Sequence, residues 1–327
     1  MREYLVRRTI SMIPTLLGIT IIVFAFIEWA PGDAATAILG SRVREGEVEY
    51  SQAELDRLRH ELGLDRPAPV RYLEWLVGLT RGDLGTSLAT KRPVSDLISL
   101  RLGPTLELMV TAFLLSSVLG VALGAISALR RYSATDHILT VVGMLGISTP
   151  TFYIGLLALF IFSIQLGLFP LGGRVSPGAT DFVSRLHHLA LPAFILGLDL
   201  TAALMRFARS SLLEVLKSDY ITTARSKGLS GTRVVLVHAF RNALIPMIVI
   251  LGLRLPILIG GSVVIETVFD WPGMGSFYLS GVRGRDYPII MTVTLFSAFA
   301  VLAASILVDV LTAAADPRVR LESKRDS

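Results

Sequence analysis

Long apolar runs separated by shorter polar stretches dominate the 327-residue sequence. A run of roughly 20 apolar residues is long enough to cross a bilayer as an α-helix. The pattern predicts six such helices, at about 10–27, 105–129, 138–164, 189–211, 243–269 and 289–311. Pro150 lies inside the third run and predicts a kink there, because the proline ring removes a backbone N–H and clashes with the preceding turn.

Residues 31–100 interrupt this pattern with a polar stretch in which acidic and basic side chains nearly balance. Ser51-Gln52-Ala53-Glu54 fits a capping box and predicts a helix over 52–62 that ends at Gly63. A second amphipathic helix is predicted over 67–80, with the apolar side chains Tyr72, Leu73, Trp75, Leu76 and Leu79. We expect the two helices to form a small lid outside the membrane.

Composition supports a membrane protein, because 52% of the residues are hydrophobic and only 17% are charged. The proposed inner segments hold sixteen Lys and Arg residues, whereas the two short outer loops, 165–188 and 270–287, hold four. The positive-inside rule therefore places both termini in the cytoplasm. This distribution by membrane side argues against a nucleic-acid partner, and the absence of cysteine excludes disulfides and thiolate metal sites.

Enzymatic signatures are missing from the sequence. There is no G-x-x-x-x-G-K-[ST] phosphate-binding loop, no G-x-S-x-G elbow and no H-E-x-x-H zinc motif. The sequence therefore indicates a subunit that is not catalytic and binds no cofactor of its own.

The longest polar run in the second half of the chain extends from Asp219 to Pro246, between the fourth and fifth predicted helices. We expect the Asp219 carboxylate to cap a helix that begins near Tyr220, and Gly228 to end it. A second helix from about Thr232 would carry the apolar residues 234–237 toward the fifth spanning helix. A solvated connector is the simpler structural alternative. The run contains one acidic residue, Asp219, and several basic residues: Arg225, Lys227, Arg233, His238 and Arg241.

This run resembles the cytoplasmic coupling segment of ABC importer permeases in the dipeptide, oligopeptide and nickel family. The matching stretches read DYITTARSKGL over 219–229 and HAFRNALIP over 238–246. Ser226 stands where the family usually has alanine, and Thr222 stands where other subfamilies have glutamate. Further landmarks in the family's order are Pro31-Gly32-Asp33, Leu62-Gly63-Leu64-Asp65, Arg81-Gly82-Asp83-Leu84-Gly85, Pro150-Thr151-Phe152, Leu168-Phe169-Pro170, Glu266-Thr267-Val268-Phe269, Trp271-Pro272-Gly273-Met274-Gly275 and Asp316-Pro317-Arg318.

The resemblance implies an all-α membrane protein with the type I ABC importer permease fold, located in a bacterial or archaeal plasma membrane. Its expected parts are 1–30 (inner terminus and first helix), 31–100 (helical segment outside the cytoplasm), 101–312 (permease domain, with the coupling segment at 213–242) and 313–327 (inner tail). The resemblance assigns ATPase coupling to Asp219, Tyr220, Thr223, Ala224, Arg225, Lys227 and Gly228, and a supporting role to His238, Arg241 and Asn242.

The implied partners are a second similar permease, two ATP-binding subunits that hold ATP and Mg²⁺, a solute-binding protein outside the cytoplasm, and membrane lipid. One permease chain would form half of the pathway for di- or oligopeptides or a related small solute. Nickel chelates, glutathione and sugars remain open alternatives for the solute.

Two charged residues, Asp199 and Arg254, fall near the middle of predicted spanning helices. Such charges are costly in lipid and usually face a partner or a water-filled cavity. We expect the two to lie near one another, either paired or lining the pathway. An ion- or proton-coupled secondary transporter is the alternative function, although Asp199, Arg254 and Asp309 are few titratable groups for one. A membrane-embedded enzyme would have only His137 and His238 near the inner face.

Overall fold

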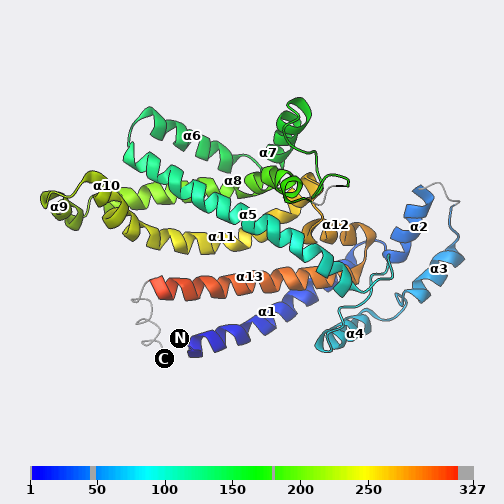
Figure 1. The fold of residues 1–327 in the computed structure, drawn as a ribbon. Coiled ribbons are helices and arrows are strands. Elements are labelled where there is room, and N and C mark those ends of the chain that lie inside the picture. Colours follow the sequence, from blue (N-terminus) through cyan, green and yellow to red (C-terminus); the bar gives the residue numbers. More distant parts are fainter. Residues whose placement is uncertain (1, 45–48, 179–180, 316–327) are drawn as a thin grey trace. The chain divides into compact units, whose positions relative to one another are not determined.

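The computed structural model describes residues 2–44, 49–178 and 181–315 (Figure 1). Within these ranges the regular elements are helices: α1 Arg2–Trp29, α2 Ala34–Arg44, α3 Gln52–Glu61, α4 Ala68–Thr80, α5 Val94–Leu129, α6 Ala134–Ser148, α7 Thr151–Ala158, the π-helix η1 Leu159–Gln165, α8 Phe182–Val215, α9 Asp219–Ser226, α10 Gly231–Arg233, the π-helix η2 Val234–Ala239, α11 Phe240–Val268, α12 Met274–Gly284 and α13 Tyr287–Ala315. An isolated bridge joins Thr86 to Pro93.

Five of the described helices are long and apolar enough to cross a membrane: α1, α5, α8, α11 and α13. A sixth span results if α6 is counted together with α7 and η1. The six predicted apolar runs are thus recovered, but α5 and α8 extend well beyond the apolar windows, to 36 and 34 residues.

The third predicted span is broken rather than kinked. Helix α6 ends at Ser148, and the segment that follows Pro150 leaves at 107°. Thr149 is extended, with φ −102° and ψ 130°, because the ring of a following proline disfavours the helical region for the residue before it. The predicted distortion at Pro150 is therefore confirmed in position, but it is a break between two helices rather than a kink within one.

The chain divides into two compact units, which we describe separately. The first unit contains Leu106–Trp271 and the described residues from Val301 onward. Helix α8 lies at its centre: its apolar window is 72% buried, and it packs against α5, α6 and α11. A Cβ atom at Gly124 would lie 2.5 Å from the Met205 carbonyl oxygen, so the glycine permits close approach of α5 and α8.

The loop before α8 is fastened to the first unit by polar contacts. His188 is buried, and its ring bonds to Ser176 and to the carbonyl oxygens of Gly172 and Gly173. The Glu107 carboxylate also accepts hydrogen bonds from Arg174 at the loop and from Arg185 on α8.

The second unit contains Arg2–Thr105 and Pro272–Ala300. The serine half of the predicted capping box is confirmed, since Ser51 Oγ accepts from the Glu54 N–H and α3 follows. Helix α4 also lies where predicted, but Leu73 is 56% exposed rather than buried. Two helices were missed: α2, and α12 in what was predicted to be an outer loop.

Candidate coupling segment and intramembrane ion pair

Helix α9 forms the core of the predicted coupling segment in the first unit. Ser218 occupies the N-cap position without a side-chain cap bond, so the prediction that Asp219 caps the helix was wrong by one residue. Asp219 is instead the first helical residue. Its carboxylate lies in the first turn, where the positive end of the helix dipole favours negative charge.

The C-terminal end of α9 is a Schellman turn built on Gly228. The Gly228 N–H donates to the Arg225 carbonyl at 2.9 Å, and the Leu229 N–H donates to the Ala224 carbonyl at 3.4 Å. Gly228 has φ +79°, a left-handed conformation that costs other residues energy. The predicted helix stop at Gly228 is confirmed.

Two residues anchor α9 to the unit. Ile221 is fully buried and Ala224 nearly so, in a cluster with Leu212 of α8 and with Ala243 and Met247 of α11. Helix α9 thus shares one buried cluster with both spanning helices.

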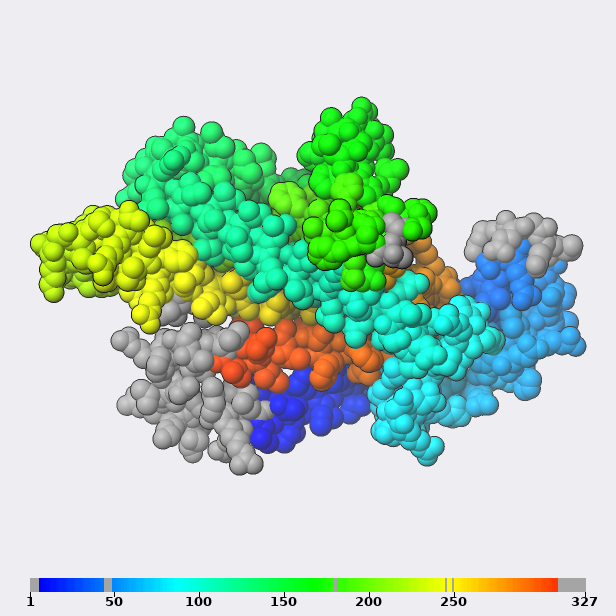
Figure 2. Space-filling model, viewed as in Figure 1, coloured from blue at the N-terminus to red at the C-terminus, as the bar shows by residue number. Residues whose placement is uncertain are grey.

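The remaining surface of α9 faces outward, and Figure 2 shows the segment, in yellow, projecting past the ends of α5 and α6. Tyr220 is 45% exposed. The other exposed residues from the predicted coupling set are Asp219, Thr223, Arg225, Lys227 and Gly228. The exposed surface thus combines an aromatic ring, hydroxyls and cationic side chains.

The residues predicted to support the segment follow α9. Asn242 Nδ2 donates both to the Tyr220 hydroxyl and to the His238 carbonyl, each at 3.0 Å. Arg241 is exposed. The chain is helical without a gap from α10 through η2 into α11.

Side chains of the apolar stretch 234–237 divide between the core and the surface. Val234 is buried, whereas Leu236 and Val237 are exposed. The predicted course of this stretch toward the fifth spanning helix is confirmed, since η2 runs directly into α11.

Asp136 is a buried carboxylate with several hydrogen-bond donors, and its role was not predicted from the sequence. Its carboxylate accepts two hydrogen bonds from Arg209 of α8, both at 2.8 Å, and further bonds from Ser127 of α5 and the Tyr132 N–H. It thereby joins α5, α6 and α8. The Ser133-x-x-Asp136 capping pattern was visible in the sequence, but it predicts only the start of α6 and not the partner on α8.

Asp199 of α8 and Arg254 of α11 form an ion pair, with Arg254 Nη1 3.3 Å from Asp199 Oδ2. The pair lines a cavity of about 90 Å³ that also borders Thr151, the first residue after the break at Pro150. The side chains of Asp199 and Arg254 keep 36% and 30% of their surface exposed. Two charges within spanning helices are therefore only partly neutralised by each other.

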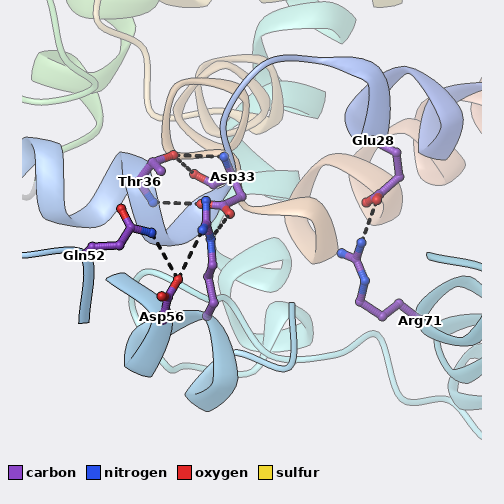
Figure 3. Close-up of polar contacts among 7 residues, drawn as sticks. Glu28, Asp33, Thr36, Gln52, Asp56 and Arg71 are labelled. Atoms are coloured by element: carbon purple, nitrogen blue, oxygen red, sulfur yellow. Dashed lines mark hydrogen bonds and ion pairs between the residues drawn. The ribbon is translucent and has the colours of Figure 1, made fainter. Parts of the chain in front are cut away.

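The second unit has its own polar contacts near the end of α1 (Figure 3). Glu28 accepts from Arg71 at 2.6 Å, and Asp33 accepts from Arg59 at 2.7 Å and from the Thr36 N–H at 2.9 Å. Burial acts to raise the pKa of Asp33, but the bonds from Thr36 and Arg59 outweigh it and hold the pKa below its usual value. Among the described residues, no three His, Asp or Glu side chains converge to hold a metal ion.

Comparison with known protein families accounts for nearly the whole chain. Residues 120–321 match the family described as binding-protein-dependent transport system inner membrane component. Residues 1–109 match the N-terminal family of the same membrane components. The chain belongs to this permease family.

Two relatives span almost their full length and that of this chain. The oligopeptide transport system permease protein AppB of Bacillus subtilis is 42% identical over 98% of this chain and 99% of its own. The glutathione transport system permease protein GsiC of Pectobacterium atrosepticum is 39% identical over 98% of this chain and 99% of its own.

A solved structure supports the fold independently. The MetNI methionine ABC transporter, in inward-facing conformations, matches with a TM-score of 0.56 at 16% identity, over 68% of this chain and 97% of its own. The predicted family and the all-α ABC permease fold are confirmed. The permease is an integral inner-membrane protein and a transport subunit of a binding-protein-dependent ABC importer.

Proposed function

We propose that α9, with the flanking residues 213–242, is the element through which a separate ATP-hydrolysing subunit drives this permease. The observation that supports the proposal is that α9 has one buried, apolar face and one exposed, polar face. Ile221 and Ala224 anchor it to α8 and α11, while the polar and basic residues named above remain uncovered. A partner that grips the exposed side would move both spanning helices as one body, the kind of rigid-body switching that alternates access.

This proposal requires α9 to lie in the cytoplasm, with both termini on the same side. The charge distribution supports that orientation, because sixteen Lys and Arg residues fall in the proposed inner segments against four in the short outer loops. Two ATPase subunits would bind ATP and Mg²⁺, and this chain would bind neither.

We further propose that a second, similar permease completes the pathway and that a solute-binding protein docks on residues 31–100 and the outer loops. Di- or oligopeptides are the proposed cargo, because the names of the relatives specify oligopeptide and glutathione transport. Asp199 and Arg254 are proposed to border the path, since their partial exposure within spanning helices requires water or a protein partner rather than lipid.

Cross-linking tests the coupling role directly, and the absence of native cysteine removes any background. Single cysteines at Thr223 and Lys227 should cross-link to the ATPase subunit in the assembled transporter. A cysteine at Val183, which is exposed at the opposite end of α8, should not. Cross-linking from Val183 but not from Thr223 or Lys227 would overturn the proposal.

A further inference from the structure

Helix α4 carries apolar side chains on two opposite faces, although it belongs to a segment predicted to lie outside the membrane. Its two charged residues are both in ion pairs, Arg71 with Glu28 and the exposed Glu74 with Arg66. One face packs in a cluster through Tyr72, Trp75, Leu76 and Leu79. The opposite face exposes Val70, Leu73 and Val77, whose spacing of three and four residues makes one stripe. Apolar side chains on two opposite faces leave one face uncovered after the other has packed, and lipid chains can cover such a face.

The neighbours of α4 place it at the depth of the bilayer. It packs on Phe24 of α1 and on Met291 of α13, and its Tyr72 hydroxyl lies 2.9 Å from Thr20 Oγ1. At 1.5 Å per residue, Phe24 and Met291 lie only about 6–8 Å from the near ends of their helices, and Thr20 lies about 14 Å from the end of α1. One leaflet of the hydrocarbon core is about 15 Å thick. Helix α4 therefore covers the part of α1 and α13 that crosses the adjoining leaflet.

An apolar groove of about 410 Å³ runs between α1, α4 and α13. Its walls include Leu16 and Leu17 of α1, Leu76 and Leu79 of α4, and Leu295 and Phe299 of α13. Thr20 also lines it, but the Thr20 hydroxyl is engaged by Tyr72 and by the Leu17 carbonyl. On the α1 side, the groove thus presents an apolar surface, because the Thr20 hydroxyl is already hydrogen-bonded.

The groove continues into the exposed apolar surface of α1. The membrane-spanning window of α1 is only 17% buried, and Ile13, which lines the groove, is 59% exposed. In a membrane-embedded chain, this surface adjoins the lipid chains.

The side chains that line the groove indicate which kind of molecule it binds. Helices that pack closely in this chain meet at small residues such as Gly120, Gly124 and Gly197. The groove instead presents large, branched and aromatic side chains, which keep another helix at a distance but suit a thin, flexible hydrocarbon chain. We propose that the groove between α1, α4 and α13 binds an acyl chain of a membrane phospholipid, and that α4 is embedded in the leaflet that adjoins residues 31–100.

This inference requires only that α1 and α13 cross the bilayer, and it does not depend on coupling through α9. Within residues 31–100 it leaves α2 and α3, rather than α4, for the proposed solute-binding protein. The test uses the assembled transporter in nanodiscs of phosphatidylethanolamine and phosphatidylglycerol that include a phospholipid with a photoreactive diazirine on its acyl chain. Peptides from α4 and from the Leu295–Phe299 region of α13 should be labelled. The variant Leu79→Trp fills the groove and should lose the α13 label, whereas Ile22→Trp, at an exposed site of α1 outside the groove, should keep it.

Spin labels provide a second measurement that does not rely on filling the groove. Nitroxides on cysteines at Leu73 and Val77 should be accessible to oxygen and shielded from a polar nickel chelate. A nitroxide at Gln52, exposed on the polar helix α3, should show the opposite preference. Two results would overturn the proposal: chelate access at Leu73 and Val77 equal to that at Gln52, or cross-linking of a cysteine at Leu79 to the second permease subunit in place of lipid labelling.

Discussion

Helix α8 carries one member of each of two Asp–Arg pairs, and the two pairs differ in the burial of the aspartate and in the number and length of their hydrogen bonds. Asp136 is 3% exposed and accepts two hydrogen bonds from Arg209, with Ser127 and the Tyr132 N–H as further donors. Asp199 is 36% exposed and accepts a single, longer bond of 3.3 Å from Arg254 beside a cavity. The first pair is saturated, and the second has unused hydrogen-bonding capacity.

The contrast distinguishes a saturated, buried pair from the pair that we propose to border the pathway. A buried charge with all its acceptor sites filled fixes the geometry of the helices that it joins. It stands near the end of the first unit that carries α9, where rigidity serves the transfer of motion. A charge pair with one weak contact in a spanning segment is free to exchange its partner for water or for a passing solute, which suits a pathway.

Removing the saturated carboxylate is expected to have the largest effect on stability. Asp136→Ala leaves Arg209 without its partner, and breaking a buried pair in this way costs about 3 kcal/mol here, the low end of the usual range because Arg209 stays 30% exposed. The thermal midpoint of purified protein in detergent, together with its yield in membranes, measures the loss. Asp96→Ala, which removes an exposed aspartate, should leave both unchanged; equal behaviour of the two variants would refute the structural role.

The loosely bonded pair should behave in the opposite way. Arg254→Gln should change the thermal midpoint little, because a partly exposed pair contributes about 1 kcal/mol or less. Peptide uptake should nevertheless fall, since the cavity loses its cation. A large drop in stability with normal uptake would show that this pair, too, is structural.

Charge reversal tests whether the pairing of Asp199 with Arg254 matters for transport. Asp199→Arg and Arg254→Asp should each reduce uptake by bringing like charges together, and the double swap should restore part of it if the pairing matters. Uptake in proteoliposomes is the readout. No recovery in the double variant would remove the support for pairing and leave only direct contact of each residue with the solute.

The Asp33–Arg59 pair in the second unit should show the smallest effect, and it depends on pH. The folded-state pKa of Asp33 is lowered, so its contribution to stability is complete above the ordinary value of 3.8 and is lost as the pH falls through the lowered value. With both side chains about a third exposed, the contribution is about 1 kcal/mol or less. Arg59→Gln should lower the thermal midpoint at pH 6 and make no difference at the acid end of the titration, whereas Arg57→Gln should have no effect at either pH.

Sequence reasoning predicted the features that depend on local chemistry. The apolar runs predicted the spanning helices, Ser51 and Glu54 predicted the start of α3, and Gly228 predicted the end of α9. Each of these features is determined by residues that are close together in the sequence. It missed what depends on distant partners. Asp136 could be recognised as part of a cap but not as the partner of Arg209, which lies 73 residues away.

The remaining errors have local physical causes. Helix α12 was hidden by glycines that suggest a loop, although Met274 and Phe277 are buried and stabilise it. The distortion at Pro150 was predicted only as a kink within one helix. The steric effect of Pro150 on Thr149 instead holds Thr149 in an extended conformation, and this ends α6 before α7 begins.

The central claim, that α9 transmits the action of a separate ATPase, is tested most directly by comparing two glycines in the reconstituted transporter. Gly228 and Gly178 both have φ +79° and open space around the missing Cβ atom, so aspartate adds the same charge and similar strain at each site. Gly228→Asp should abolish peptide uptake while the ATPase still hydrolyses ATP. Gly178 lies in an outer loop, at the proposed docking side of the solute-binding protein, so Gly178→Asp should keep uptake in the wild-type ratio to ATP hydrolysis even where both fall together. Undiminished, ATP-dependent uptake in the Gly228→Asp transporter would contradict the account.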